Sequence, residues 1–176
     1  MKISELDLNI LNKIRKNVKE FALESSLKFD KPGLRILDIA PQDHGGLRDV
    51  YKNTNVDTLD IDPSSGATYI ADLCRNNEST IPSASYDLIF CSEVLEHTLN
   101  PFLAADEILR ILKPGGSAWI TTPFNFRIHG PLPDCWRFTE HGLRSLLSKF
   151  SSEEIRPMES EDRFLMPYQY LVKAIR

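Results

Sequence analysis

Carboxylate side chains stand at or near the ends of several apolar runs in this sequence, where they could hold a ligand. Asp38 lies within the first run, Asp60 closes the second and Asp72 follows the third. A carboxylate at the end of a second strand can accept hydrogen bonds from both hydroxyls of a ribose, and one after a third strand from an adenine amino group. A pyrophosphate would need a glycine-rich loop such as GxGxxG, and none follows the first run. The pattern therefore predicts a site for a positively charged nucleoside without phosphate.

Two histidines follow the later apolar runs and could act as general bases. His97 comes shortly after the run 86–91, and His129 lies on the connection that follows the run 117–122. Histidine titrates near neutral pH, which suits it to deprotonate a hydroxyl. We expect one of the two to act on an acceptor hydroxyl. The alternative for His97 is that it only caps or packs a short helical turn.

The connection that carries His129 holds further candidates for a substrate site. Long loops of this kind often carry function. We expect Asp134 and Arg137 on this connection to bind substrate. The alternative is that the loop is tied down by its own hydrogen bonds, with Trp136 and Phe138 filling the core.

The spacing of cysteines and histidines predicts no metal site. Cys74, Cys91 and Cys135 form no CxxC pair, and their odd number argues against a disulfide framework. The four histidines show no HExxH or similar ligand spacing. We expect three reduced thiols and no bound metal.

Buried strands must position these side chains. Five apolar runs are nearly continuous in hydrophobicity, which is typical of strands that are covered on both faces: 34–40, 56–61, 68–71, 86–91 and 117–122. Two further strands are expected at 153–157 and 168–175. Because helices alternate with these strands, we predict a doubly wound α/β sheet, whose ligands bind at the carboxyl ends of the strands. That edge would gather Asp38, Asp60, Asp62, Asp72, Glu93 and Glu96.

Three helices are predicted around this sheet. An apolar stripe through residues 3–27 predicts an amphipathic helix that packs on the domain. Asn100 and Pro101 are suited to begin a helix that Lys113-Pro114-Gly115-Gly116 ends, and Thr139 can cap another. Only residues 62–67 separate the second and third strands, so we expect that crossover to lack a helix.

Length and composition describe one globular domain. The 176 residues predict a single domain over 1–176, with an N-terminal helix in 1–30 and the α/β core in 31–176. A net charge of −4 argues against nucleic-acid binding through a basic face. No apolar run approaches the roughly 20 residues of a membrane span. We therefore expect a cytoplasmic protein, and the sequence leaves its oligomeric state open.

Several segments together resemble class I S-adenosylmethionine-dependent methyltransferases, over roughly residues 33–176. The resemblance rests on ILDIA (36–40), TLDIDP (58–63), ADL (71–73), YDLIFCSEVLEH (86–97) and EILRILKPGG (107–116). It implies a Rossmann-like, mostly parallel seven-stranded sheet with an antiparallel last strand, and S-adenosylmethionine as cofactor. Residues 123–143 are similar to small-molecule methyltransferases, some of them linked to sugar or glycolipid pathways. The expected acceptor is a small molecule, with a saccharide or a lipid-linked intermediate among the candidates.

Matching positions carry the family's cofactor contacts onto this chain. For the adenosine half, the resemblance implies Asp60 at the ribose hydroxyls, Asp72 and Leu73 at the adenine, and Ile61 on its apolar face.

For the reacting half, it implies Asp38 and the loop from Ala40 near the methionine part, and Cys91 and Ser92 beneath the sulfonium. His97 falls where such enzymes often have a histidine that faces the substrate.

One departure from the family concerns its first loop, which usually reads DxGxGxG. Here Ala40 replaces the first glycine, Pro41 stiffens the turn, and Gly45 and Gly46 could restore a close approach. The departure keeps a second interpretation open, a non-catalytic S-adenosylmethionine-binding or interaction module. A nicotinamide-dependent oxidoreductase is the third, and the missing GxGxxG argues against it.

Overall fold

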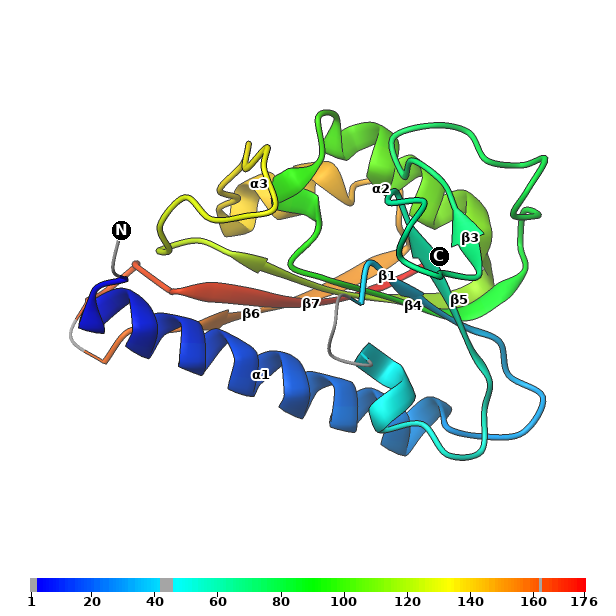
Figure 1. Ribbon diagram of the computed structural model, residues 1–176, viewed down its shortest axis with the longest axis horizontal. Coiled ribbons are helices and arrows are strands. Elements are labelled where there is room, and N and C mark those ends of the chain that lie inside the picture. Colours follow the sequence, from blue (N-terminus) through cyan, green and yellow to red (C-terminus); the bar gives the residue numbers. More distant parts are fainter. Residues whose placement is uncertain (1–2, 42–45, 162) are drawn as a thin grey trace.

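A central seven-stranded sheet organises the chain, and helices cover both of its faces (Figure 1). The computed structural model describes residues 3–41, 46–161 and 163–176. The strand order is β3-β2-β1-β4-β5-β7-β6, and β7 runs antiparallel to both of its neighbours. The strands are β1 (Ile36–Ile39), β2 (Val56–Asp60), β3 (Tyr69–Ile70), β4 (Tyr86–Ser92), β5 (Leu112–Pro123), β6 (Ser152–Met158) and β7 (Gln169–Ile175). The predicted doubly wound, mostly parallel sheet is confirmed.

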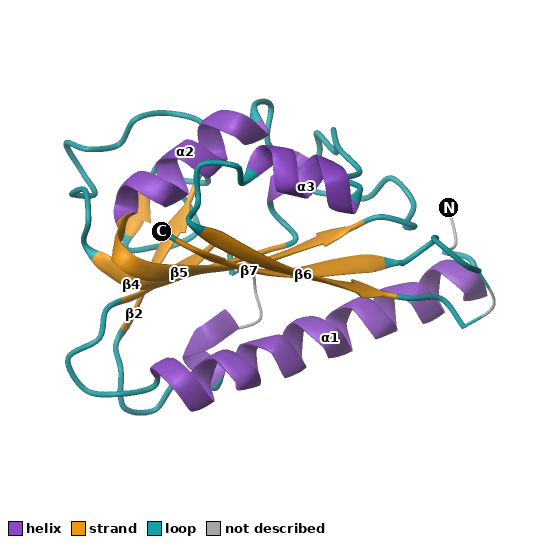
Figure 2. Ribbon diagram, turned by 180° about the vertical axis from the view of Figure 1, so that it is seen from behind, coloured by secondary structure: helices purple, strands orange, loops and turns teal. Residues whose placement is uncertain are grey.

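The two faces of the sheet carry different helices (Figure 2). The long helix α1 (Glu5–Phe29) and the short 3-10 helix η1 (Gly46–Asp49) lie on one face, and α2 (Pro101–Ile111) and α3 (Glu140–Leu146) on the other. Phe21 of α1 packs against Trp119 and Phe90 of the sheet, with ring centroids 4.6 and 5.9 Å apart. Each face therefore has its own apolar core.

The helix α1 begins and ends two residues later than predicted, and its apolar stripe is only partly buried. Ile14 and Phe21 are buried, whereas Ile3 and Leu6 are 40% and 68% exposed. The first turns of α1 extend past the ends of the strands, so they have no sheet to pack against (Figure 1). The predicted packing of this helix on the domain is therefore confirmed at Ile14 and Phe21 and does not extend to Ile3 and Leu6.

The predicted helix starts are confirmed by their caps. Asn100 Oδ1 accepts a hydrogen bond from the Leu103 amide at 3.2 Å, and Thr139 Oγ1 accepts one from the Gly142 amide at 3.1 Å. Each side chain thus satisfies an amide that the helix itself leaves without a partner.

The predicted end of the helix before residues 113–116 is confirmed, since α2 stops at Ile111, but these residues themselves belong to the start of β5. Leu112 pairs with Tyr86, and the next paired residues are Ser117 and Leu88. The residues between them bulge out of the ladder, which turn-forming residues permit. The other strands lie within two residues of their predicted ends.

The crossovers from β1 to β2 and from β2 to β3 are as short as predicted. Within the described residues, β2 and β3 are joined without a helix, and β1 and β2 with only η1 between them. In the same part of the chain, no helix combines the length and apolar character that crossing a membrane requires.

Candidate active site

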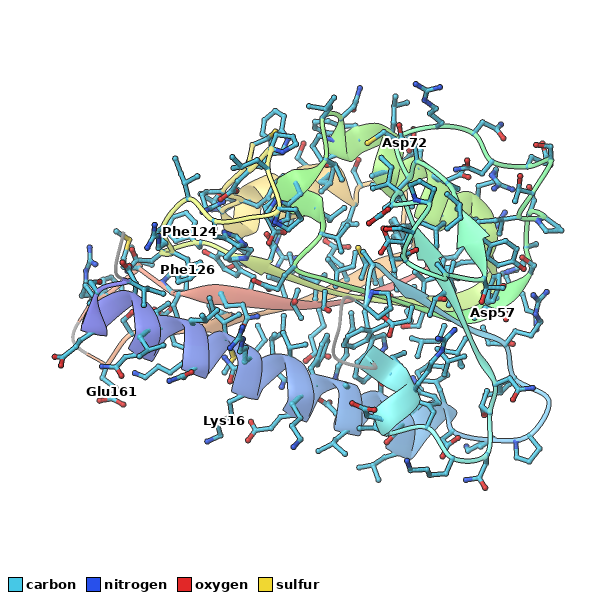
Figure 3. The ribbon with its side chains drawn as sticks, viewed as in Figure 1. Lys16, Asp57, Asp72, Phe124, Phe126 and Glu161 are labelled. Carbon is cyan, nitrogen blue, oxygen red and sulfur yellow. The ribbon has the colours of Figure 1, made fainter. Side chains whose placement is uncertain are left out.

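A cavity of about 430 Å³ lies between α1 and the carboxyl ends of β1 and β4. Five of the residues predicted to bind ligand or act on it line this cavity: Asp38, Ala40, Ser92, His97 and His129. One wall is the face of α1 that looks toward the sheet. The connection after β5 contributes another wall through Phe126, which lies above the N-terminal half of α1 (Figure 3).

Asp38 is buried in β1 beneath η1, and its only described hydrogen bond is to the backbone. The amide of Leu47 donates to its Oδ2 at 2.7 Å. Burial raises the pKa of this carboxyl to about 7, although the Leu47 amide opposes the shift. A binding partner with positive charge would therefore be favoured next to it.

Gly46 at the start of η1 permits this close approach. Its φ is +55°, and a Cβ there would lie 2.2 Å from Asp38 Oδ2 and 2.6 Å from the Pro41 Cβ. A side chain is sterically excluded, so Gly46 is the glycine that keeps the loop close to Asp38. Gly45, which we also expected to help, lies outside the described residues.

Ala40 keeps a backbone conformation that glycine adopts readily. Its φ is +49°, and its amide donates to the Leu59 carbonyl at 2.7 Å. A left-handed residue with a Cβ costs roughly 1–2 kcal/mol. Alanine in place of the family's first glycine is therefore tolerated at the cost of backbone strain.

The residues predicted for the adenosine half lie at the ends of β2 and β3, outside the cavity. Asp60 Oδ1 accepts from the Asp62 amide at 2.8 Å, and the neighbouring Ile61 is 69% exposed. Asp72 lies on the α2 side of the sheet (Figure 3), where its Oδ1 accepts from the Cys74 amide at 2.9 Å. The residues predicted to contact the cofactor therefore lie in two neighbouring places on one edge of the sheet, at the cavity and at the ends of β2 and β3.

Two predicted contacts have buried side chains. Leu73 and Cys91 are 6% and 0% exposed and belong to the core on the α2 side. Burial raises the pKa of the Cys91 thiol. Because side chains alternate along a strand, Ser92 faces the cavity while Cys91 faces away from it. A ligand would reach Cys91 and Leu73 only through their backbone.

The structure brings His97 and His129 together around Glu96, which the sequence placed at the ligand edge of the sheet without a specific role. His97 and Glu96 lie in the 3-10 helix η2 (Leu95–His97). Their side chains approach to 3.7 Å between His97 Nε2 and Glu96 Oε1, and His129 Nε2 lies 3.8 Å from the same oxygen. The two imidazole rings meet edge to face with centroids 4.8 Å apart. The sequence feature that could have identified Glu96 as a site residue is its position next to His97 in the SEVLEH run.

Glu96 is fully buried, and the cluster around it is electrostatically unusual. Burial, together with the nearby charge of Glu93, raises its pKa well above the ordinary value. Burial also lowers the pKa of His129. Both effects disfavour charged side chains at this point of the cavity wall.

Asp134 and Arg137 hold the connection after β5 in place. Arg137 donates to both oxygens of Asp134 at 2.5 and 2.8 Å, and its pairing holds the pKa of that carboxyl well below its usual range. Arg137 also donates to the carbonyls of Phe126 and Arg127, at 3.3 and 2.9 Å. These contacts support the interpretation that both residues tie the loop down, and they leave the predicted substrate contact untested.

The aromatic residues of this connection differ in burial. Phe138 is 8% exposed and fills the core as expected, whereas Trp136 is 40% exposed. Trp136 Nε1 donates to the Thr98 carbonyl at 2.8 Å, which fixes the connection against the segment after η2. The alternative in which both aromatic residues fill the core therefore holds for Phe138 and not for Trp136, whose ring stacks on Phe138 with centroids 6.2 Å apart.

Glu93, which the sequence placed at the ligand edge without a specific role, lines the cavity. It has a φ of +53°, and its Oε1 accepts from Thr121 Oγ1 at 2.8 Å and from Gln169 Nε2 at 2.9 Å. Burial raises the pKa of Glu93. Its contacts join the ends of β4, β5 and β7 at the cavity.

Comparison with known proteins gives a consistent family and fold. The family described as a methyltransferase domain matches residues 7–158. A SAM-dependent methyltransferase from Archaeoglobus fulgidus superposes with a TM-score of 0.69 at 17% identity, over 93% of this chain and 96% of that one. Among curated proteins, none matches this sequence.

Two longer proteins share the fold over part of their length. Phosphoethanolamine N-methyltransferase 2 of Haemonchus contortus, solved with S-adenosyl-L-methionine, has a TM-score of 0.68 at 17% identity and covers 90% of this chain. The CurJ carbon methyltransferase has a TM-score of 0.64 at 16% identity and covers 87% of this chain. This chain spans about half of each, 52% and 51% respectively.

Proposed function

Because the chain belongs to the family of methyltransferase domains, we propose that it transfers a methyl group from S-adenosylmethionine to a small-molecule acceptor. The single observation that carries the proposal is the cavity at the carboxyl edge of the sheet. It has Asp38 and Ala40 at one side and His97 and His129 at another. Cofactor and acceptor can meet there.

The residues present fit the cofactor along the sheet edge. Asp60 offers a carboxylate beside the exposed side chain of Ile61, which suits a ribose and the apolar face of an adenine. Asp38, beneath the glycine at position 46, offers a carboxylate where the methionine part would lie. The excess of acids at this edge suits a cofactor whose sulfonium carries positive charge.

The bound cofactor supplies an already activated methyl group, so the chain must position the acceptor and exclude water. The loop that carries His129 is fixed by Arg137, which keeps the cavity wall in place. His97 Nδ1 is engaged by the Pro133 carbonyl at 2.9 Å, so its Nε2 is the nitrogen left for the cavity side. We assign His97 and His129 the activation of an acceptor hydroxyl.

The α1 wall supports an acceptor with an apolar part. Leu11, Ile14 and Val18 contribute apolar side chains to it, and Arg15 and Lys19 add positive charge. This combination suits a hydroxyl compound that carries both an apolar group and an anionic one. A lipid-linked saccharide has that chemistry, and we propose it as the acceptor class.

The test is single-turnover methyl transfer from labelled S-adenosylmethionine to a panel of saccharides and lipid-linked saccharides. The proposal expects one acceptor class to be methylated, with losses of 10²-fold or more in His97→Asn or His129→Asn. The exposed His141 on α3 provides the control variant His141→Asn, which should transfer at the wild-type rate. Unchanged rates in both cavity variants would contradict the roles of these histidines. Cofactor binding without any transfer would favour the non-catalytic module.

A further inference from the structure

The geometry points to a divalent transition-metal site formed by Glu96, His97 and His129 at the wall of the cavity. These residues come from η2 and from the connection after β5, and each offers one ligand atom. The sequence predicted no metal site, because His129 is 32 positions from His97 and no sequence motif joins them. What the ion does rests on the proposed function, whereas its binding does not.

The three donor atoms already lie close to a metal-binding arrangement. All of them are within 4.8 Å of one another, and each Nε2 lies 3.7 or 3.8 Å from Glu96 Oε1. A tetrahedral site with Zn–N bonds of about 2.0–2.1 Å separates its donors by roughly 3.3 Å. Small side-chain movements would therefore close these donors around an ion.

The carboxylate of Glu96 lacks any other partner that the structure describes. Its side chain is 0% exposed, and neither oxygen has a hydrogen-bond partner among the described residues. Buried carboxyl groups are almost always paired or bound to a metal, because the loss of water is otherwise uncompensated. A cation between Glu96 and the two rings would provide that compensation.

Both histidines are held with Nε2 toward Glu96. His97 Nδ1 lies 2.9 Å from the Pro133 carbonyl, and a proton on Nδ1 leaves Nε2 free to act as a ligand. His129 Nδ1 lies 3.1 Å from Asp134 Oδ2 but forms no hydrogen bond among the described residues, and the backbone amide of His129 donates to that oxygen at 2.9 Å instead. A carbonyl or carboxylate behind the imidazole is the usual arrangement around metal-ligating histidines.

The ligand set selects the class of ion. Two imidazole nitrogens and one carboxylate oxygen suit Zn²⁺, Co²⁺ or Fe²⁺, whereas Mg²⁺ and Ca²⁺ prefer oxygen ligands throughout. Three protein ligands leave at least one coordination position open, as in catalytic zinc sites. Since His97 and His129 line the cavity, that position would be accessible to an acceptor oxygen.

A bound ion would change how the hydroxyl is activated. The acceptor oxygen would coordinate the ion, which lowers the pKa of the hydroxyl so that its proton leaves to solvent water. The oxygen then forms the new bond to the methyl carbon as the sulfur–carbon bond breaks. The electron pair of that bond stays on sulfur, which neutralises the sulfonium. His97 and His129 would act as ligands and not as free bases.

The test is titration of the chelator-treated full chain with Zn²⁺ in a calorimeter. We expect one equivalent to bind, with affinity at least 10-fold weaker in Glu96→Gln and in His129→Asn. The control His141→Asn should bind as the wild type does. Circular dichroism and thermal melting show that each variant is folded. Absence of Zn²⁺ binding by the wild type, or undiminished binding by folded Glu96→Gln, would overturn the site and favour a neutral, protonated Glu96.

Co²⁺ identifies the ligands, because its visible spectrum reports coordination and a thiolate adds a charge-transfer band. The exposed Cys135 lies beside the cluster, since its amide donates to the Glu96 carbonyl at 2.7 Å. A spectrum without the thiolate band supports the assigned ligands, and one with it overturns them. Transfer by the metal-free chain at the full rate would overturn the role of the ion. Zn²⁺ binding with no transfer to any acceptor would instead count against the proposed function.

Discussion

At the scale of single residues, the first loop shows how an altered position can keep its backbone conformation. Ala40 has a φ of +49° where related proteins usually have glycine, and Gly46 provides the close approach to Asp38. A Cβ at position 40 is tolerated with strain, whereas one at position 46 would overlap a buried carboxylate. The two positions therefore differ in what each can accept.

Replacing Ala40 by glycine should relieve this strain. We expect Ala40→Gly to raise the free energy of unfolding by about 0.5–1 kcal/mol, since the gain of roughly 1–2 kcal/mol is partly offset by the freer unfolded chain. Urea unfolding measures it. Ala84→Gly is the matched control, because Ala84 has a similar φ of +52° away from the cavity. Both variants should be stabilised, and only Ala40→Gly should alter the affinity for S-adenosylmethionine. Destabilisation by Ala40→Gly would contradict this account.

Asp38 predicts a pH dependence of stability. Its pKa is about 7 in the folded chain and 3.8 in the ordinary reference state, so the folded chain holds a proton that the unfolded chain releases. Stability from this group is therefore present in full below about pH 4 and is lost as the pH rises through 7. The loss is of the order of a few kcal/mol.

The measurement for Asp38 is urea unfolding at pH 5 and pH 8 in the wild type and in Asp38→Asn. The variant keeps an oxygen that can accept from the Leu47 amide, and it removes the titration. Because Glu93 and Glu96 shift in the same direction, only the difference between the two proteins isolates Asp38. Equal pH dependence in both proteins would contradict the prediction.

At the scale of elements, α1 is the main cover of one face of the sheet, and it also walls the cavity. Phe21 packs on Trp119 and Phe90. Two polar pairs fix the helix against β7, Asn17 with Gln169 at 3.1 Å and Glu24 with Lys173 at 2.6 Å. On the other face, α2 and α3 share the cover. The cavity therefore depends on how firmly a single helix is held.

Truncating the anchor of α1 should cost far more than truncating an exposed residue of the same helix. We expect Phe21→Ala to lower the free energy of unfolding by about 3–5 kcal/mol, because it leaves a cavity in the core. Leu27→Ala, at a side chain that is 86% exposed, should change it by less than about 0.5 kcal/mol. Urea unfolding of both variants measures the contrast, and similar losses would show that α1 is held by other contacts.

At the scale of the whole molecule, the fold was predictable and the arrangement of the site only in part. Strands such as β1 and β4 are buried on both faces, so their apolar runs are visible in the sequence. The start of β5 was missed because its bulge is built from turn-forming residues. Caps and apolar runs were sufficient to predict the helix starts and the buried strands, because these depend on residues that are close together in the sequence.

The histidine pair shows why the remainder could not be predicted. His129 Nε2 comes within 3.8 Å of Glu96 on a connection after β5 that Arg137 holds through Asp134 and the Arg127 carbonyl. Those contacts depend on side-chain geometry that no spacing in the sequence records. The alternation of side chains along β4 places Cys91 and Ser92 on opposite faces of the sheet. Only the structure shows that Cys91 faces the core and Ser92 faces the cavity.

We propose that the carboxyl edge of this sheet binds S-adenosylmethionine, and calorimetric titration of the chain with that cofactor is the test of this binding. We expect one equivalent to bind, with affinity lowered at least 10-fold, about 1.4 kcal/mol, in Asp60→Asn. The control Asp106→Asn, an exposed carboxylate of α2 paired with Lys149, should bind as the wild type does. Failure of the wild-type chain to bind the cofactor, or full affinity in Asp60→Asn, would contradict the account.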